Sequence, residues 1–228
     1  MVAVKICGLT DAEAVTVAVA EGAAYLGFVF YPPSPRALSP DHFATLRATV
    51  PAAPRRPHCV GVFVDPEEET IAAVLAAAPL DSLQLHGSET PERVAALRAA
   101  FGLPVIKALR VAAAEDLDAC AAFEAAADMF LFDAPPPRAG ALPGGNAETF
   151  DWSLLAHLRS KRPWILAGGL EVTNLERAVR RTGARIVDVS SGVERAPGVK
   201  DPDRIRAFLQ LARSLEARPA VPSAERQT

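Results

Sequence analysis

The feature that most constrains the fold is a regular alternation of short apolar runs with alanine-rich, charge-flanked segments along the chain. The apolar runs, rich in Val, Ile, Leu and Phe, are predicted to be strands at 2–6, 24–30, 59–63, 82–85, 104–107, 128–132, 163–167 and 186–189. The segments that follow them are predicted to be helices at 11–22, 40–50, 66–78, 90–101, 114–126, 151–159, 171–182 and 202–215. Eight such units predict an α/β fold with a closed, parallel eight-stranded sheet, the (β/α)8 TIM barrel.

A doubly wound open sheet is the alternative architecture for this alternation. A dinucleotide-binding sheet of that kind needs a GxGxxG turn after the first strand, and the segment CGLT at 7–10 has no such pattern. The barrel is therefore the favoured prediction.

Three helix starts follow capping chemistry. Thr10, Ser39 and Thr90 are the predicted N-caps of the first, second and fourth helices, because a hydroxyl there can accept a hydrogen bond from the first turn. The second and fourth helices also have Pro as the first residue, which suits that position.

The chain of 228 residues suits one α/β domain. We expect a single barrel domain over 1–215. The remaining segment, EARPAVPSAERQT at 216–228, has no apolar period and two prolines, and it is predicted to be a mobile tail.

Composition narrows the classes of partner. The net charge is -3 and the 24 basic residues are dispersed, so no basic block is available for nucleic acid or an anionic membrane. No apolar run reaches the roughly 18 residues of a membrane helix, and the first ten residues lack a signal-peptide pattern. Three cysteines without a CxxC pair argue against a disulfide framework and a zinc cluster. We expect a cytoplasmic protein with free thiols, no metal and a small-molecule partner.

The first predicted strand carries a thiol and an ammonium group on one face. Val2, Val4 and Ile6 alternate with Lys5 and Cys7, so the last two point together toward the barrel interior. A nearby cation lowers the pKa of a thiol, so Lys5 could make Cys7 a base. The plainer interpretation of a lone cysteine on an apolar strand is buried packing.

Asp133 ends the sixth predicted strand, after four apolar residues. A carboxyl held partly out of water keeps its proton to a higher pH, which suits a general acid. The alternative interpretation is a cap of the following loop.

Small residues gather after the last two strands, in ILAGGL and VDVSSGVE. Backbone N–H groups can approach an anion closely there, as in the phosphate site of many barrels. The sixth loop, which contains LPGGNAETFDW, has about 18 residues where two to six are usual. It is predicted to be a lid or a third phosphate contact.

Other polar residues share the interior face. Gln84 and His86 alternate with two leucines, and His86 is either a proton relay or a hydrogen-bonded support. Burying Asp188 or Lys5 alone would cost several kcal/mol, so the two are predicted to form an ion pair. Lys107, at the end of the fifth strand, is placed as the lysine of a Schiff-base aldolase would be.

Longer motifs add a family resemblance. The segments KICGLT, GFVFYPPSPR, VGVFVD, LQLHG, FDA, GGNAETFDW, ILAGGL and DVSSGVE stand in the order and spacing of phosphoribosylanthranilate isomerase. From residue 2 to about 212 the chain resembles this family of tryptophan biosynthesis. The resemblance implies a (β/α)8 barrel that converts N-(5-phosphoribosyl)anthranilate to 1-(2-carboxyphenylamino)-1-deoxyribulose 5-phosphate. It also implies an Amadori rearrangement with no metal or organic cofactor.

The resemblance also implies residue roles. Cys7 is similar to the general base that takes the proton from ribose C2, and Asp133 to the general acid that protonates the ring oxygen. Arg36 matches the arginine that binds the anthranilate carboxylate, a task suited to a planar two-pronged donor. The implied phosphate cradle consists of Gly169, Ser190, Ser191 and Gly192, assisted by Gly145 in the sixth loop. Apart from the resemblance, we expect His86 to bind the substrate from the interior face of the fourth strand. One departure is Ala147, where the family usually has glycine.

Two rival functions stay open at this point. One is a Lys107 aldolase acting on a sugar phosphate, and the other is a phosphate-binding barrel without catalysis. The presence of both Cys7 and Asp133 argues against the second. The assembly is expected to be a monomer or a homodimer.

Overall fold

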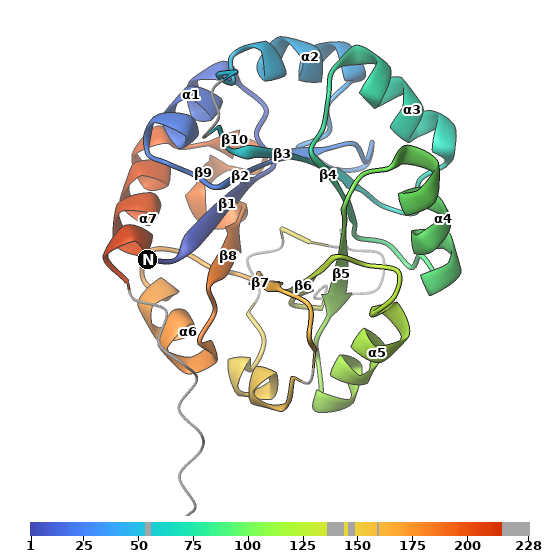
Figure 1. The fold of residues 1–228 in the computed structure, drawn as a ribbon. Coiled ribbons are helices and arrows are strands. Elements are labelled where there is room, and N and C mark those ends of the chain that lie inside the picture. The colour runs from blue at the N-terminus through green and yellow to red at the C-terminus, as the bar shows by residue number, and fades with distance from the viewer. Residues whose placement is uncertain (53–55, 136–143, 146–148, 159, 216–228) are drawn as a thin grey trace, which may run out of the picture.

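In the computed structural model, eight parallel strands close into a barrel surrounded by helices (Figure 1). The structure describes residues 1–52, 56–135, 144–145, 149–158 and 160–215, so the predicted mobile tail and Ala147 lie outside the described residues. The strands are β1 (Ala3–Cys7), β2 (Tyr25–Val29), β3 (His58–Phe63), β4 (Ser82–Leu85), β5 (Val105–Arg110), β6 (Met129–Asp133), β7 (Trp164–Leu166) and β8 (Ile186–Val189). They follow one another in chain order, and β8 pairs with β1. The (β/α)8 prediction is confirmed and the open sheet is wrong.

The helices fill the outer ring, where α7 at the end of the chain lies beside α1 (Figure 1). They are α1 (Ala12–Ala20), α2 (Pro40–Ala48), α3 (Glu68–Ala77), α4 (Pro91–Phe101), α5 (Ala119–Phe123), α6 (Leu175–Thr182) and α7 (Pro202–Ser214). The 3-10 helix η1 (Ala114–Asp118) precedes α5. The α-helix predicted over 151–159 is wrong, because the 3-10 helix η2 (Trp152–His157) stands there. Its buried residues Trp152 and Leu155 are three apart, which matches three residues per turn.

The N-cap predictions are confirmed at two helices and wrong at one. Ser39 and Thr90 accept hydrogen bonds from the first turns of α2 and α4. At α1 the cap is Asp11, whose carboxylate accepts from the Ala14 N–H at 2.8 Å. The Thr10 hydroxyl instead donates to the carbonyl of Gly198, 3.0 Å away, because a second partner lies within its reach.

Alternation along the strands divides the apolar side chains between the outside and the inside of the barrel. Val4, Ile6 and Leu26 belong to the large core between sheet and helices. Val60 and Leu131 belong to a small core inside the barrel. Polar residues fill the barrel above this small core, so the period of two in each strand decides which side chains reach the functional end.

A short antiparallel hairpin between β8 and α7 was not predicted. The 3-10 helix η3 (Ser191–Val193) leads into β9 (Glu194–Ala196), and β10 (Val199–Lys200) pairs with it. These strands have three and two residues, too few for a readable period. The hairpin brings a carboxylate to Arg36, in the loop after β2, and an ammonium group to the carbonyl of Ser190, directly after β8.

We predict that Asp11→Ala lowers the free energy of unfolding by about 1 kcal/mol, because the first turn of α1 loses its cap. Urea denaturation of the whole chain measures this change. Glu13→Ala is the matched control, since Glu13 lies in the same turn without capping it and contributes only about 0.3 kcal/mol. Equal losses in the two variants would refute the assignment of the cap.

Candidate active site

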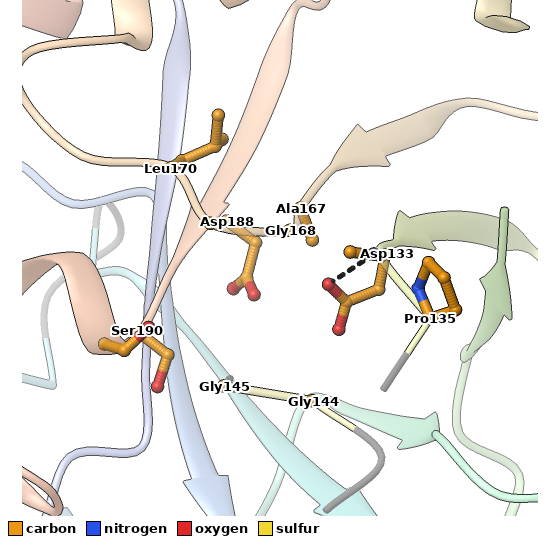
Figure 2. A pocket seen from close by; sticks show the side chains of 12 residues that line it. Asp133, Pro135, Gly144, Gly145, Ala167, Gly168, Leu170, Asp188 and Ser190 are labelled. Carbon is orange, nitrogen blue, oxygen red and sulfur yellow. Dashed lines mark hydrogen bonds between the residues drawn. The ribbon is translucent and has the colours of Figure 1, made fainter. Parts of the chain in front are cut away.

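Two adjoining cavities open at the carboxyl ends of the strands. The glycine cavity is lined by residues that include Gly168, Gly169, Ser190 and Ser191. The thiol cavity is lined by residues that include Cys7, Arg36, His86 and Val62. Both are lined by Asp133, Gly144, Gly145, Asp188 and Ser190, so together they form one hollow. Figure 2 shows the carboxylates of Asp133 and Asp188 on either side of the glycine cavity, with Gly144 and Gly145 across from them.

A buried ion pair lies beneath the thiol. Lys5 is fully buried, and its Nζ lies 2.8 Å from Oδ1 of Asp188, so the predicted pair is confirmed. Burial lowers the pKa of Lys5, but the charges of Asp188 and Cys7 outweigh burial and the net shift of this pKa is upward. Gly27 on β2 makes room for the side chains of Lys5 and Cys7, because a Cβ at this position would lie 2.9 Å from Sγ of Cys7 and 3.0 Å from Nζ of Lys5.

The expected lowering of the Cys7 pKa is wrong. Burial raises the pKa of the Cys7 thiol, Lys5 lowers it, and Asp188 raises it again. The net shift of this pKa is upward, because Cys7 is only 7% exposed and Asp188 cancels part of the field of Lys5. Lys5 therefore limits the rise in this pKa but does not reverse it.

Asp133 sits at the end of β6 with one oxygen fixed and the other facing His86. Its Oδ1 accepts a hydrogen bond of 2.8 Å from the Ala134 N–H, drawn as the dashed line in Figure 2. Its Oδ2 lies 3.3 Å from Nε2 of His86, close enough for an ion pair although the hydrogen-bond alignment is poor. The other ring nitrogen of His86 lies 3.1 Å from Nε2 of Gln84. The imidazole is thus supported on one side and meets the carboxyl on the other.

The loops after β7 and β8 form the glycine cavity. Gly168 and Gly169 have φ values of 83° and 57°, a backbone region that other residues avoid. The side-chain amide of Asn174 donates to the Gly169 carbonyl at 2.9 Å, which fixes this turn. Gly192 lines neither cavity. A Cβ on Gly192 would overlap the carbonyl of Leu170, so this glycine lets the two loops pack together.

Arg36 lines the thiol cavity but is already bound along one edge. Its Nε lies 2.7 Å from Oε1 of Glu194 and its Nη2 lies 2.8 Å from Oε2. Nη2 also donates to the carbonyl of Gly145 at 3.4 Å. The sequence interpretation contained the motif that includes Glu194 but gave that residue no role.

Sequence reasoning also missed an apolar wall in the thiol cavity. Val29, Tyr31, Val62 and Val64 line it, and the first three pack around Cys7. The period of two in GFVFY and VGVFVD could have identified this wall, because it places these side chains on the interior face.

The aldolase interpretation of Lys107 is wrong. Lys107 shares its strand face with Val105 and Leu109, which belong to the core under the helices, and it lines neither cavity. Its Nζ lies 2.7 Å from Glu89 and 5.7 Å from the ring centre of Phe123. An ammonium group held in this way outside the barrel cannot reach a substrate in the hollow.

Two further observations concern the described part of the chain. No cluster of three or more His, Cys, Asp or Glu side chains is arranged there to hold a metal ion. No helix among these residues has the length and apolar character to cross a membrane.

A closed barrel of this kind, with a thiol and a carboxyl facing a glycine-lined hollow, is typical of barrel enzymes that act on phosphorylated substrates by acid–base chemistry. Residues 4–211 match the family described as N-(5'phosphoribosyl)anthranilate (PRA) isomerase. The chain belongs to this family of isomerases.

Individual relatives agree with this membership. The chain is 56% identical to N-(5'-phosphoribosyl)anthranilate isomerase of Paramagnetospirillum magneticum, over 93% of this chain and 97% of that protein. It is similar to the monomers generated from dimeric phosphoribosylanthranilate isomerase of Thermotoga maritima, with a TM-score of 0.77, 35% identity and coverage of 94% and 100%. It is also similar to a phosphoribosyl anthranilate isomerase solved with reduced 1-(o-carboxyphenylamino)-1-deoxyribulose 5-phosphate, with a TM-score of 0.77, 36% identity and the same coverage.

We predict that the double variant Lys5→Met/Asp188→Asn raises the pKa of Cys7, because Lys5 lowers this pKa by more than Asp188 raises it. Replacing both residues leaves no unpaired buried charge. Peptide-resolved alkylation by iodoacetamide at pH 8 measures the effect, and Cys7 should react more slowly than in the parent chain.

The exposed Lys161→Met is the matched control, and the buried Cys59 and Cys120 serve as internal references. Alkylation of Cys7 at an unchanged or higher rate in the folded double variant would show that Lys5 does not lower the pKa of the thiol.

Proposed function

We propose that this chain converts N-(5-phosphoribosyl)anthranilate to 1-(2-carboxyphenylamino)-1-deoxyribulose 5-phosphate in tryptophan biosynthesis, with Cys7 as general base and Asp133 as general acid. The observation that carries this proposal is that these two side chains, from β1 and β6, line the same cavity. Membership of the isomerase family and the similarity to a complex with the reduced product support it.

The proposed reaction needs two proton transfers at different atoms. Asp133 donates a proton to the ring oxygen while the C1–O bond breaks, and the nitrogen lone pair forms the C=N bond of a Schiff base. The thiolate of Cys7 then removes the proton from C2, and those electrons form the C1=C2 bond as the nitrogen becomes neutral. A proton gained at C1 and one lost from the C2 hydroxyl complete the ketone. Acid and base on separate strands suit this sequence.

The remaining proposed residues bind the two ends of the substrate. The phosphate is assigned to the glycine cavity, with Gly169, Ser190 and Ser191 as its lining and Gly192 as the residue that holds the two loops together. His86 contacts Asp133, which lines both cavities, and Gly145 contacts Arg36.

The aromatic ring is assigned to the apolar wall of the thiol cavity. Val29, Tyr31 and Val62 offer an apolar surface of the kind that binds a phenyl ring. The free edge of the Arg36 guanidinium then meets the carboxylate. Binding of groups remote from C2 orients the reacting atoms between acid and base.

We propose that the chain acts in the cytoplasm as a monomer or a homodimer. All three cysteines are free and buried, which fits a reducing compartment. A similar isomerase, from Thermotoga maritima, is described as dimeric.

We predict that Cys7→Ser and Asp133→Asn each lower kcat by about 10²- to 10⁴-fold, the usual contribution of a general acid or base. Loss of substrate fluorescence in a continuous assay measures the rate. Cys120→Ser is the matched control, because Cys120 is a buried cysteine of α5 outside both cavities. No turnover by the parent chain would refute the function, and a variant that keeps a tenth of the activity would refute the role of that residue.

A further inference from the structure

The guanidinium of Arg36 lines the thiol cavity and also binds a carboxylate of the protein. A guanidinium presents two edges that can each bind a carboxylate through two N–H groups. Glu194 occupies the edge formed by Nε and Nη2, at 2.7 and 2.8 Å. The edge formed by Nη1 and Nη2 meets no carboxylate among the described residues. Its Nη2 donates a long bond of 3.4 Å to the carbonyl of Gly145, which a carboxylate in the cavity would replace. Glu194 thereby sets the plane of the guanidinium and the direction in which its free edge points.

A second cation binds the same carboxylate. Nζ of Lys200, which is 2% exposed, lies 2.7 Å from Oε1 of Glu194 and also donates to the carbonyl of Ser190 at 3.0 Å. Burial raises the pKa of Glu194, but Arg36 and Lys200 outweigh burial and the net shift is downward, so the carboxylate is ionised. Two cations around one anion leave one positive charge in excess, beside a cavity whose substrate carries an acid group.

The hairpin that holds Glu194 is fixed to the loop that holds Arg36. The Gly198 N–H donates to Oε2 of Glu194 at 3.2 Å, and the Thr10 hydroxyl binds the carbonyl of the same glycine. A Cβ on Gly198 would lie 2.5 Å from the carbonyl of Pro35, so the hairpin turn packs directly against the residue before Arg36. The support of the arginine is therefore part of the rigid fold.

We propose that Glu194 is the positioning residue of Arg36, and that Lys200 connects this pair to Ser190 of the glycine cavity. Glu194 touches no substrate. It directs the free edge of Arg36 toward the carboxylate of the substrate, and Lys200 joins the parts of the site that bind the carboxylate and the phosphate. Glu194 thus determines the selectivity for a substrate with an acid group on its aromatic ring. This inference rests on the proposed role of Arg36.

The test compares two ligands in the full-length chain. One is reduced 1-(o-carboxyphenylamino)-1-deoxyribulose 5-phosphate, and the other is the same molecule without the carboxylate. In Glu194→Gln, calorimetry should show binding of the first ligand weakened by about tenfold or more, and binding of the second changed less than about twofold. Equal weakening of both ligands, or no change in either, would overturn the proposal, since a purely structural residue gives no selectivity for the carboxylate.

Further variants separate the possible failures. Arg36→Met should also abolish the preference for the carboxylate ligand; if it weakens both ligands equally, the proposed role of Arg36 fails. If Arg36→Met removes the preference and Glu194→Gln keeps it, only the present inference fails. Glu194→Asp retains the charge with a shorter reach and should lose part of the preference, which keeps the test decisive if Glu194→Gln does not fold. Glu176→Gln, in an exposed pair with Arg180, is the matched control and should bind both ligands as the parent chain does.

Discussion

The functional end of this barrel depends on the rule that a charge removed from water must meet an opposite charge. Lys5 and Lys200 are almost completely buried, and each lies 2.7 to 2.8 Å from one carboxylate. An uncompensated charge at either position would cost several kcal/mol. Asp188 and Glu194 are therefore required by the cations next to them. Because Asp188 lies on β8 and Lys5 on β1, the first pair also joins the last strand of the barrel to the first. Glu194 makes a similar connection through Arg36, in the loop after β2.

These pairs explain why the thiol and the arginine respond differently to their surroundings. Burial dominates and raises the pKa of Cys7, because the charge of Lys5 is shared between Asp188 and Cys7. Arg36 stays charged in any environment. Glu194 instead fixes the orientation of the Arg36 guanidinium. The first pair thus acts through the pKa of a neighbour, and the second acts through the orientation of a neighbour.

The sequence predicted the barrel and the interior placement of Lys5, Gln84 and Asp188, because a period of two repeated over eight strands is a strong signal. It did not predict the hairpin that carries Glu194, since strands of two and three residues have no measurable period. It also placed the first N-cap on Thr10. The Thr10 hydroxyl can form a hydrogen bond either with the first turn of α1 or with a carbonyl that is distant in sequence. Only the tertiary structure determines which of the two bonds forms.

The binding groups of the hollow carry charges that fit a substrate with two anionic ends. Arg36, Lys200 and Glu194 together carry one excess positive charge next to the apolar wall, and the glycine cavity adds backbone groups suited to a phosphate. A substrate with a carboxylate at one end and a phosphate at the other would complete this pattern at both ends. Binding of the carboxylate and the phosphate, both remote from C2, supplies free energy that can hold the reacting atoms next to the Cys7 thiol, whose pKa is raised. A buried base is therefore compatible with catalysis, because the charges of the substrate are matched by the binding groups around the base and not by the base itself.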